Sequence, residues 1–282
     1  MSRLLQVSDT HFGTEQPDVV EALLRLVRAQ PPDTVVLSGD ITQRARRRQF
    51  RAAQRFVERL AVPDTLVLPG NHDIPLFNVI ARLFAPYANH RRAFGPELEP
   101  ECESADLLVI GVNTTRPSRH TDGEVSADQI ARVSQHLRQA SANQLRIVVT
   151  HQPVHVTCHE DETNVLHGSR EAVYAWASAG VDLILGGHIH LPYVRPLRER
   201  FTDLPRSVWA VQAGTAVSSR VRGGIPNSVN LIRYAAAERP QHCAVERWDY
   251  DAAGQRFAPV DRVEIRLDRG GSSHENVLTD PP

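Results

Sequence analysis

The chain has 282 residues, of which 41% are hydrophobic and 23% are charged, as in globular proteins large enough to bury a substantial core. The formal net charge of −1 excludes a surface adapted by bulk charge to nucleic acid or to an anionic membrane. The three widely spaced cysteines do not form a disulfide framework, so we expect a cytoplasmic location.

Membrane insertion is not expected from the sequence. A spanning helix needs an apolar run of about 18 residues, and the apolar runs of this chain are shorter. Polar residues from Asp9 to His11 follow the N-terminus too early to leave room for the apolar part of a signal peptide. We therefore expect no membrane partner.

Short apolar runs recur along the first two thirds of the chain, and they are continuous rather than alternating. They lie at 3–8, 33–39, 64–70, 107–112, 146–151 and 181–187. Continuous runs of this length are typical of strands buried on both faces of a sheet.

Helical patterns lie between these runs. Apolar residues recur at helical spacing in 19–30, 49–61, 126–140 and 174–180, with Ser126 as a predicted N-cap and Gly180 as a predicted C-cap. The alternation of strands and helices predicts an α/β sandwich.

The segment 75–94 carries a further helical stripe of apolar residues, formed by Ile80, Leu83, Phe84 and Tyr87. We interpret it as core packed on the sandwich. The alternative is a cap over the site by the polar end of the segment.

The pattern changes after residue 205, where the predicted strands become shorter and more alternating. We interpret them as a mainly antiparallel sheet within a single domain that spans 1–268. The remaining segment 269–282 is polar and rich in glycine and proline, and we expect it to be disordered.

Nearly every buried run ends in an acid, an amide or a histidine. These residues are Asp9, His11, Asp40, Asn71, His72, Asp73, His151, His188 and His190. Taken singly, an acid could serve a turn and a lone histidine is more often structural. Because ligands bind at the carboxyl ends of strands in α/β sheets, we favour one shared site.

The mixture of imidazole and carboxylate points to metal chemistry. Such ligands suit Mn, Fe or Zn, and the lack of cysteine in the set disfavours a structural zinc site. Seven ligands exceed what one tetrahedral ion accepts, but they suit two ions of the kind that catalyse phosphoryl displacement.

The motifs that carry these residues resemble the calcineurin-like metallophosphoesterase superfamily. They are D-x-H at 9–11, G-D at 39–40, G-N-H-D at 70–73, the lone His151 and G-H-x-H at 187–190. The stretches SDTHFG, SGDIT, THQP and GGHIH, with the later segment 211–232, are most similar to class III cyclic-nucleotide phosphodiesterases.

This resemblance implies a four-layer αββα sandwich of two mixed β-sheets with a dinuclear site at the sheet edges. It implies one ion held by Asp9, His11, Asp40 and His190, and a second held by Asp40, Asn71, His151 and His188. The expected ions are Mn or Fe, with Zn as an alternative.

The resemblance gives His72 a different role. It would contact a phosphate oxygen and protonate the leaving alkoxide as a general acid, and Asp73 would either orient it or serve the turn. The expected substrate contacts are His11, Asp40, Asn71, His72 and His190.

By this resemblance, the expected substrate is a small phosphodiester, with cAMP as the leading cyclic nucleotide. The alternatives are a lipid-precursor pyrophosphatase, a phosphomonoesterase, a nuclease or a non-catalytic scaffold. Gln43 and Arg44 replace the Asp and Arg-Gly of the protein phosphatases, which disfavours that activity. A lipid substrate would need an apolar lid, which the sequence does not identify. Nucleic acid is not expected as a partner, and a homodimer stays open.

Two polar segments fit this scheme less directly. The basic run 44–55 is interpreted as a solvated helix face, with attraction of a phosphate anion as the alternative. The stretch CHEDE at 158–162, with His155, His159 and His167 nearby, is interpreted as a polar loop at the lip of the site rather than a third metal site.

Overall fold

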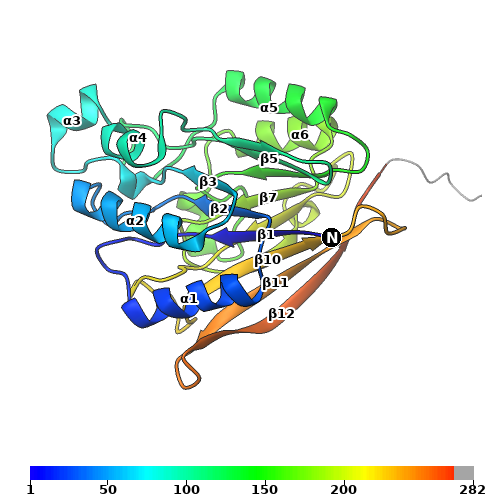
Figure 1. The fold of residues 1–282 in the computed structure, drawn as a ribbon. Coiled ribbons are helices and arrows are strands. Elements are labelled where there is room, and N and C mark those ends of the chain that lie inside the picture. Colours follow the sequence, from blue (N-terminus) through cyan, green and yellow to red (C-terminus); the bar gives the residue numbers. More distant parts are fainter. Residues whose placement is uncertain (270–282) are drawn as a thin grey trace, which may run out of the picture.

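The computed structural model describes residues 1–269, and two six-stranded β-sheets organise them (Figure 1). The first sheet has the order β12-β11-β10-β1-β2-β3. Its strands are β1 (Ser2–Val7), β2 (Thr34–Ser38), β3 (Asp64–Leu68), β10 (Ser228–Tyr234), β11 (His242–Asp251) and β12 (Arg256–Arg266). Strands β1 to β3 run parallel, whereas β10 to β12 pair antiparallel.

The second sheet has the order β4-β5-β6-β7-β9-β8. Its strands are β4 (Glu101–Glu103), β5 (Leu107–Gly111), β6 (Leu145–Val149), β7 (Leu183–Gly186), β8 (Tyr193–Pro196) and β9 (Trp209–Gln212). The four inner strands are parallel, and the edge strands β4 and β8 pair antiparallel with their neighbours.

Helices cover the outer face of each sheet. Helices α1 (Pro17–Ala29) and α2 (Arg47–Leu60) share a core cluster with the first sheet. Helices α5 (Ala127–Gln139) and α6 (Ser169–Ala179) share another with the second sheet. A third cluster lies between the sheets. These clusters join four layers, so the predicted αββα sandwich of two mixed sheets is confirmed.

The continuous apolar runs have a direct cause in this layering. Successive side chains of a strand point to opposite faces. In β2, Val35 and Leu37 therefore face the helices, while Val36 faces the other sheet. Both faces are buried, so the three central positions of the strand are apolar.

The predicted helix ends are confirmed by their capping contacts. The Ser126 side chain accepts a hydrogen bond from the backbone N–H of Gln129, and Gly180 ends α6 in a left-handed conformation. Helix α6 begins at Ser169, five residues before the predicted start. The prediction took the apolar run as the start of the helix, whereas the first turn begins directly after Gly168.

The core interpretation of segment 75–94 is wrong for three of the four residues of its apolar stripe, and the fourth, Tyr87, is half-buried. The segment forms two short helices, α3 (Val79–Phe84) and α4 (Ala88–Phe94), and Ile80, Leu83 and Phe84 are exposed. Helix α4 packs on α2, with the rings of Phe94 and Phe50 6.3 Å apart. Helix α3 projects beyond them at one end of the molecule (Figure 1).

The interpretation of the chain after residue 205 is wrong in part. Strand β9 is parallel to β7 in the second sheet, and β11 and β12 are the longest strands of the described chain. The alternation reflects β12 at a sheet edge with one solvated face. Of the segment predicted to be disordered, Arg269 donates to Asp182, and 270–282 lie outside the described residues.

The remaining short helices are of the 3₁₀ type. They are η1 (Asn71–Asp73), η2 (His159–Asn164) and η3 (Leu197–Glu199). Within residues 1–269, no helix has the length and apolar character needed to cross a bilayer.

Candidate metal centre

The structure brings all seven predicted metal ligands to one edge of the sandwich. Asp9 and His11 follow β1, Asp40 follows β2 and Asn71 follows β3, all in the first sheet. His151 follows β6, and His188 and His190 follow β7, in the second sheet. These strands are parallel within each sheet, so their carboxyl ends meet where the two sheets face each other.

One group of potential ligands consists of Asp9, His11 and His190, whose ligand atoms lie within 4.8 Å of one another. The Nε2 atoms of His11 and His190 are 3.0 Å apart, and His190 Nε2 lies 3.3 Å from an oxygen of Asp9. Two imidazole nitrogens aimed at each other at this distance suit a shared cation or proton.

The second group consists of Asp40, His151 and His188, whose ligand atoms also lie within 4.8 Å of one another. Asn71 completes it, because its Oδ1 lies 3.2 Å from His151 Nε2 and 3.0 Å from His188 Nδ1. This group therefore offers two nitrogens and two kinds of oxygen, a donor set that fits a borderline divalent metal.

Asp40 lies between the two groups. Its Oδ1 is 3.3 Å from His151 Nε2, and its Oδ2 is 3.7 Å from His11 Nε2. A carboxylate in this position can contribute one oxygen to each side.

The opposite ring nitrogens of three histidines are held by oxygen acceptors. His151 Nδ1 contacts the carbonyl of Ser38 at 2.9 Å, and His190 Nδ1 contacts that of Arg220 at 2.7 Å. His188 Nε2 lies 3.3 Å from Asn164 Oδ1. Partners of this kind fix the ring orientation and the tautomer of metal-ligating histidines. His11 differs, since its buried Nδ1 has no partner among the described residues.

Burial keeps two of the rings neutral. Burial lowers the pKa of His11 to about 3 and that of His188 to about 4, against the attraction of Asp40 and Asp9. For His151 burial also acts to lower the pKa, but the charge and hydrogen bond of Asp40 prevail and raise it to about 9. Neutral imidazoles keep the lone pairs that a metal needs.

The backbone at these positions is unusual. Asp9, His11, Asp40, His188 and His190 all have φ between 40° and 73°, which is the left-handed region. Side chains other than glycine adopt it rarely, and such strain concentrates at functional sites. Five of the seven predicted ligands therefore lie on strained backbone shortly after a strand.

Glycines before the ligands are required by close approach. A Cβ on Gly70 would lie 2.1 Å from the backbone nitrogen of Asp40, and one on Gly187 would lie 2.5 Å from Oδ2 of Asp9. A Cβ on Gly39 would lie 2.3 Å from Nδ1 of His151. The glycines of the three motifs therefore let loops from different strands touch.

Asp73 supports the loops and does not contact His72. Its carboxylate accepts hydrogen bonds from the backbone N–H groups of Gly70, Ile41 and Thr42, at 2.8–2.9 Å. Of the two predicted roles, the geometry favours service to the turn. Burial and the neighbouring Asp40 charge raise its pKa to about 6.

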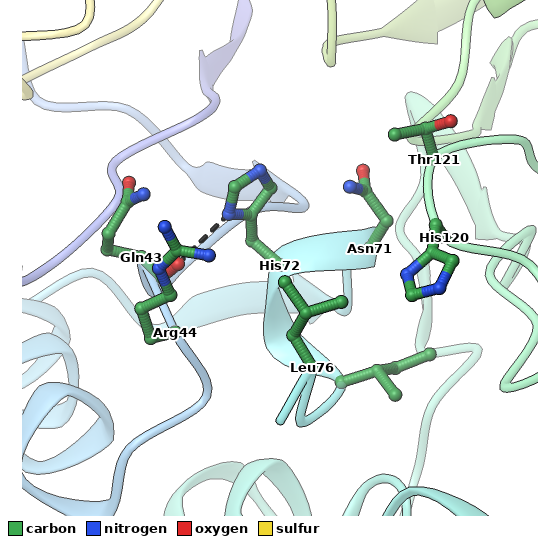
Figure 2. Close-up of a pocket in the computed structure, with 8 residues that line it drawn as sticks. Gln43, Arg44, Asn71, His72, Leu76, His120 and Thr121 are labelled. Atoms are coloured by element: carbon green, nitrogen blue, oxygen red, sulfur yellow. Dashed lines mark hydrogen bonds between the residues drawn. The ribbon is translucent and has the colours of Figure 1, made fainter. Parts of the chain in front are cut away.

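His72 forms a third group of potential ligands with His11 and Asp40, whose ligand atoms lie within 4.8 Å of one another. Its Nε2 is 4.0 Å from Oδ2 of Asp40. Its Nδ1 contacts the backbone carbonyl of Gln43 at 2.9 Å, so Nδ1 carries the hydrogen and Nε2 faces the site (Figure 2). Arg220 lies next to it, with Nη1 3.3 Å from His72 Nε2 and 3.1 Å from Gln43 Oε1.

A cleft of about 120 Å³ opens in front of His72 and Asn71. Figure 2 shows Gln43 and Arg44 on one side of it, His120 and Thr121 on the other, and Leu76 below His72. Most of the segment 158–162, predicted to be a polar loop at the lip of the site, lies in the 3₁₀ helix η2, and Asn164 at the end of that helix contacts His188.

Sequence reasoning missed Arg220, His120 and Thr121 as site residues. His120 and Thr121 lie in a polar loop after β5 that carries no motif. Arg220 is 30 residues beyond His190, and the only signal for it was the segment 211–232.

The family is shown by comparison with known proteins. A family model described as calcineurin-like phosphoesterase matches residues 2–192, more than half of the chain. The chain therefore belongs to the calcineurin-like phosphoesterase family and is a metal-dependent phosphoric ester hydrolase. The expected resemblance is confirmed.

Curated relatives are similar at low identity. A probable cyclic nucleotide phosphodiesterase from Synechococcus sp. is 24% identical over 68% of this chain and 74% of its own length. A cAMP/cGMP dual specificity phosphodiesterase from Mycobacterium tuberculosis is 23% identical over 78% of this chain and 70% of its own. A probable glycerophosphodiester phosphodiesterase from Arcobacter nitrofigilis is 25% identical over 66% and 71%.

Solved structures share the fold. A dimetal phosphatase from Danio rerio has a TM-score of 0.62 at 12% identity, with 95% of this chain and 99% of that chain covered. A purple acid phosphatase from yellow lupin has a TM-score of 0.71 at 12% identity over 95% of this chain. The chain spans 54% of the length of that phosphatase.

Proposed function

We propose that the protein is a dinuclear metal-dependent phosphodiesterase for a small phosphodiester, and that its substrate is a 3′,5′-cyclic nucleotide such as cAMP. The supporting observation is the position of Asp40 between two groups of ligands, with one oxygen toward His151 and the other toward His11. The relatives named as cyclic-nucleotide phosphodiesterases support the substrate.

The ligands are assigned by group. Asp9, His11, Asp40 and His190 would hold one ion, and Asp40, Asn71, His151 and His188 would hold the other. The ions are Mn or Fe, with Zn as an alternative. When bound, two such ions lower the pKa of water and polarise phosphoryl oxygens.

His72 is assigned the proton transfer to the leaving alkoxide. The Gln43 carbonyl accepts from Nδ1–H, which leaves Nε2, the atom near Asp40 and Arg220, as the ring atom through which a proton would be transferred. A general acid must reach the leaving oxygen directly, and Nε2 is the part of the ring that faces the site.

Arg220 is assigned the binding of a phosphate oxygen. Its guanidinium is held by Gln43 Oε1 and lies against His72, so its charge is placed at the point where the phosphate and the general acid meet. A guanidinium binds phosphate through more than one N–H. In this scheme, His11, Asp40, Asn71 and His190 line the remaining phosphate contacts.

We further propose a cytoplasmic location. The support is that Cys102, Cys158 and Cys243 are all free thiols, as is usual in a reducing compartment.

The first experiment is hydrolysis of cAMP and of bis(4-nitrophenyl) phosphate by the Mn-loaded protein, with Asn71→Ala as the site variant and Asn143→Ala as the matched control. We expect AMP from the wild type and a loss of about a hundredfold or more in Asn71→Ala, since the loss of an outer partner of a ligand already costs about 10- to 100-fold. No AMP from protein that holds two ions per chain would exclude the cyclic nucleotide. Glycerophosphodiesters would then be assayed.

A second experiment separates the proton donor from the phosphate contact. His72→Ala should slow cAMP hydrolysis by about a hundredfold but affect the nitrophenyl ester little, because nitrophenolate needs no proton to leave. Arg220→Ala should instead raise KM about tenfold for both substrates. Equal effects of His72→Ala on both substrates would refute the acid assignment.

A further inference from the structure

Helix α3 and the residues before it form an exposed apolar surface, which we call the α3 surface and define as Leu76, Phe77, Val79, Ile80, Leu83 and Phe84. Six of the nine exposed large hydrophobic residues of the described chain lie in this stretch. Phe84 is 84% exposed and Phe77 is 79% exposed. Scattered apolar residues need no explanation, but a contiguous set indicates an interaction surface.

The orientation of α3 is fixed by its one charged side chain. Arg82 is only 8% exposed, and its guanidinium donates to the backbone carbonyls of Pro75, Pro117 and Arg119. A helix on a water-exposed surface turns its charge outward and its apolar face inward. Helix α3 does the reverse, and three hydrogen bonds hold it so.

The surroundings of the α3 surface carry a strong positive charge. The segments 41–57 and 74–96 contain nine arginines and no aspartate or glutamate, although the whole chain has a net charge of −1. Eight of these arginines are exposed: Arg44, Arg46, Arg47, Arg48, Arg51, Arg55, Arg91 and Arg92.

Contacts place these arginines at the same end of the molecule as the α3 surface. Arg44 stacks over the ring of Phe77 at 5.4 Å, and Asn89 of α4 donates to the carbonyl of Ala45 just before α2. Helices α2, α3 and α4 lie together at one end in Figure 1. The end therefore combines an apolar protrusion with a basic rim.

We propose that the α3 surface docks on an anionic lipid bilayer, with its apolar side chains in the headgroup region and the arginines of α2 and α4 on the lipid phosphates. Apolar burial and attraction to anionic headgroups together define interfacial binding. Leu76 belongs both to this surface and to the cleft of His72, so docking would place the mouth of the cleft at the lipid–water boundary.

This interaction is independent of the proposed hydrolysis. The net charge of the chain gave no reason to expect membrane binding. The positive charge proposed to act here is local, and acidic residues elsewhere in the chain balance it.

The test is co-sedimentation of the full chain with vesicles of equal parts phosphatidylglycerol and phosphatidylcholine, and with vesicles of phosphatidylcholine alone. We expect binding to the anionic vesicles that weakens between about 0.1 and 0.5 M salt. Ile80→Ser/Phe84→Ser should reduce the partition coefficient at least about tenfold, and so should Arg47→Glu/Arg48→Glu. Val260→Ser and Arg138→Glu, at exposed sites elsewhere, are the matched controls and should bind as the wild type does.

Light scattering provides the opposing outcome. A stable dimer that Phe84→Ser converts to a monomer, together with no binding to anionic vesicles, would overturn the proposal in favour of self-association. Equal binding to both kinds of vesicle, or unchanged binding by both double variants, would also overturn it. Hydrolysis of a soluble ester by each variant shows whether the variant is folded. The vesicle assay needs neither metal nor substrate, so its result does not depend on the proposed catalytic function.

Discussion

At the candidate metal centre the chain gathers polar side chains in its interior, whereas at the α3 surface it holds apolar side chains in solvent. Both arrangements are opposed by solvation and both are maintained by the surrounding structure. The interior histidines and carboxylates have partners, strained loops and glycines that let the loops touch. The α3 surface is held in place by the buried Arg82, which donates hydrogen bonds to backbone carbonyls of the neighbouring loop. The comparison indicates that such exceptions mark function when their geometry is fixed.

The largest expected effect is at the carboxylate between the two ligand groups. Asp40→Ala should lower kcat/KM about a thousandfold, because it removes a potential ligand from both ions at once. The metal content per chain should fall in the same variant, as measured by plasma mass spectrometry. Asp128→Ala, an exposed acid in the first turn of α5, is the control. An Asp40 variant that kept both ions and full activity would refute the shared-carboxylate scheme.

The next effect concerns the contact between loops. Gly70→Ala would place a Cβ 2.1 Å from the Asp40 nitrogen and 2.2 Å from its Oδ1, where backbone must shift. We expect a loss of about 3 kcal/mol in the free energy of unfolding, measured by denaturant titration, with a matching loss of activity. Gly224→Ala is the control, because the added Cβ would meet open space. The positive φ at this position should lower the free energy of unfolding of the variant by only about 1–2 kcal/mol. Equal losses in the two variants would show that the close contact is unimportant.

The buried His90, away from the candidate metal centre, allows a comparison with three histidines of the centre, whose ring nitrogens have hydrogen-bond partners. His90 lies between Phe50 and Phe94, and neither ring nitrogen has a partner among the described residues. Burial, aided by the charge of Arg91, lowers its pKa from 6.5 to about 4. The unfolded chain therefore binds more protons between these values, so the His90 contribution is complete above pH 6.5 and is lost as the pH falls toward 4.

The expected size follows from about 1.4 kcal/mol per pKa unit, which gives a loss of about 3 kcal/mol across this window. His90→Phe should remove that part of the pH dependence, as followed by urea unfolding at several pH values. An unchanged slope would mean that His90 is not the group that titrates.

The smallest effect is expected at the α3 surface itself. Phe84→Ser should change the free energy of unfolding by no more than about 0.5 kcal/mol, as for other exposed sites. Phe50→Ala, at a residue only 2% exposed, should cost about 3–5 kcal/mol. Thermal unfolding of both variants decides whether Phe84 is in solvent. A loss at Phe84 close to that at Phe50 would mean that the isolated chain buries it.

The sequence by itself determined the sandwich and the set of residues at its edge. The central strands of both sheets carry apolar runs because both of their faces are covered, and the predicted ligands follow strand ends. Parallel pairing then brings those ends together without further information. The proximity of Asp9, Asp40 and His151 was therefore predictable from local pattern.

Only the tertiary structure decided which groups surround that set and which way α3 faces. The contact between Arg220 and His72 joins residues 148 positions apart, and the carbonyl of Gln43 that orients His72 leaves no mark on the sequence. The stripe of Ile80, Leu83 and Phe84 reads equally well as core or as surface. Its direction depends on three carbonyls that bind Arg82, two of them more than 30 residues away, and such distant contacts do not enter a periodic pattern.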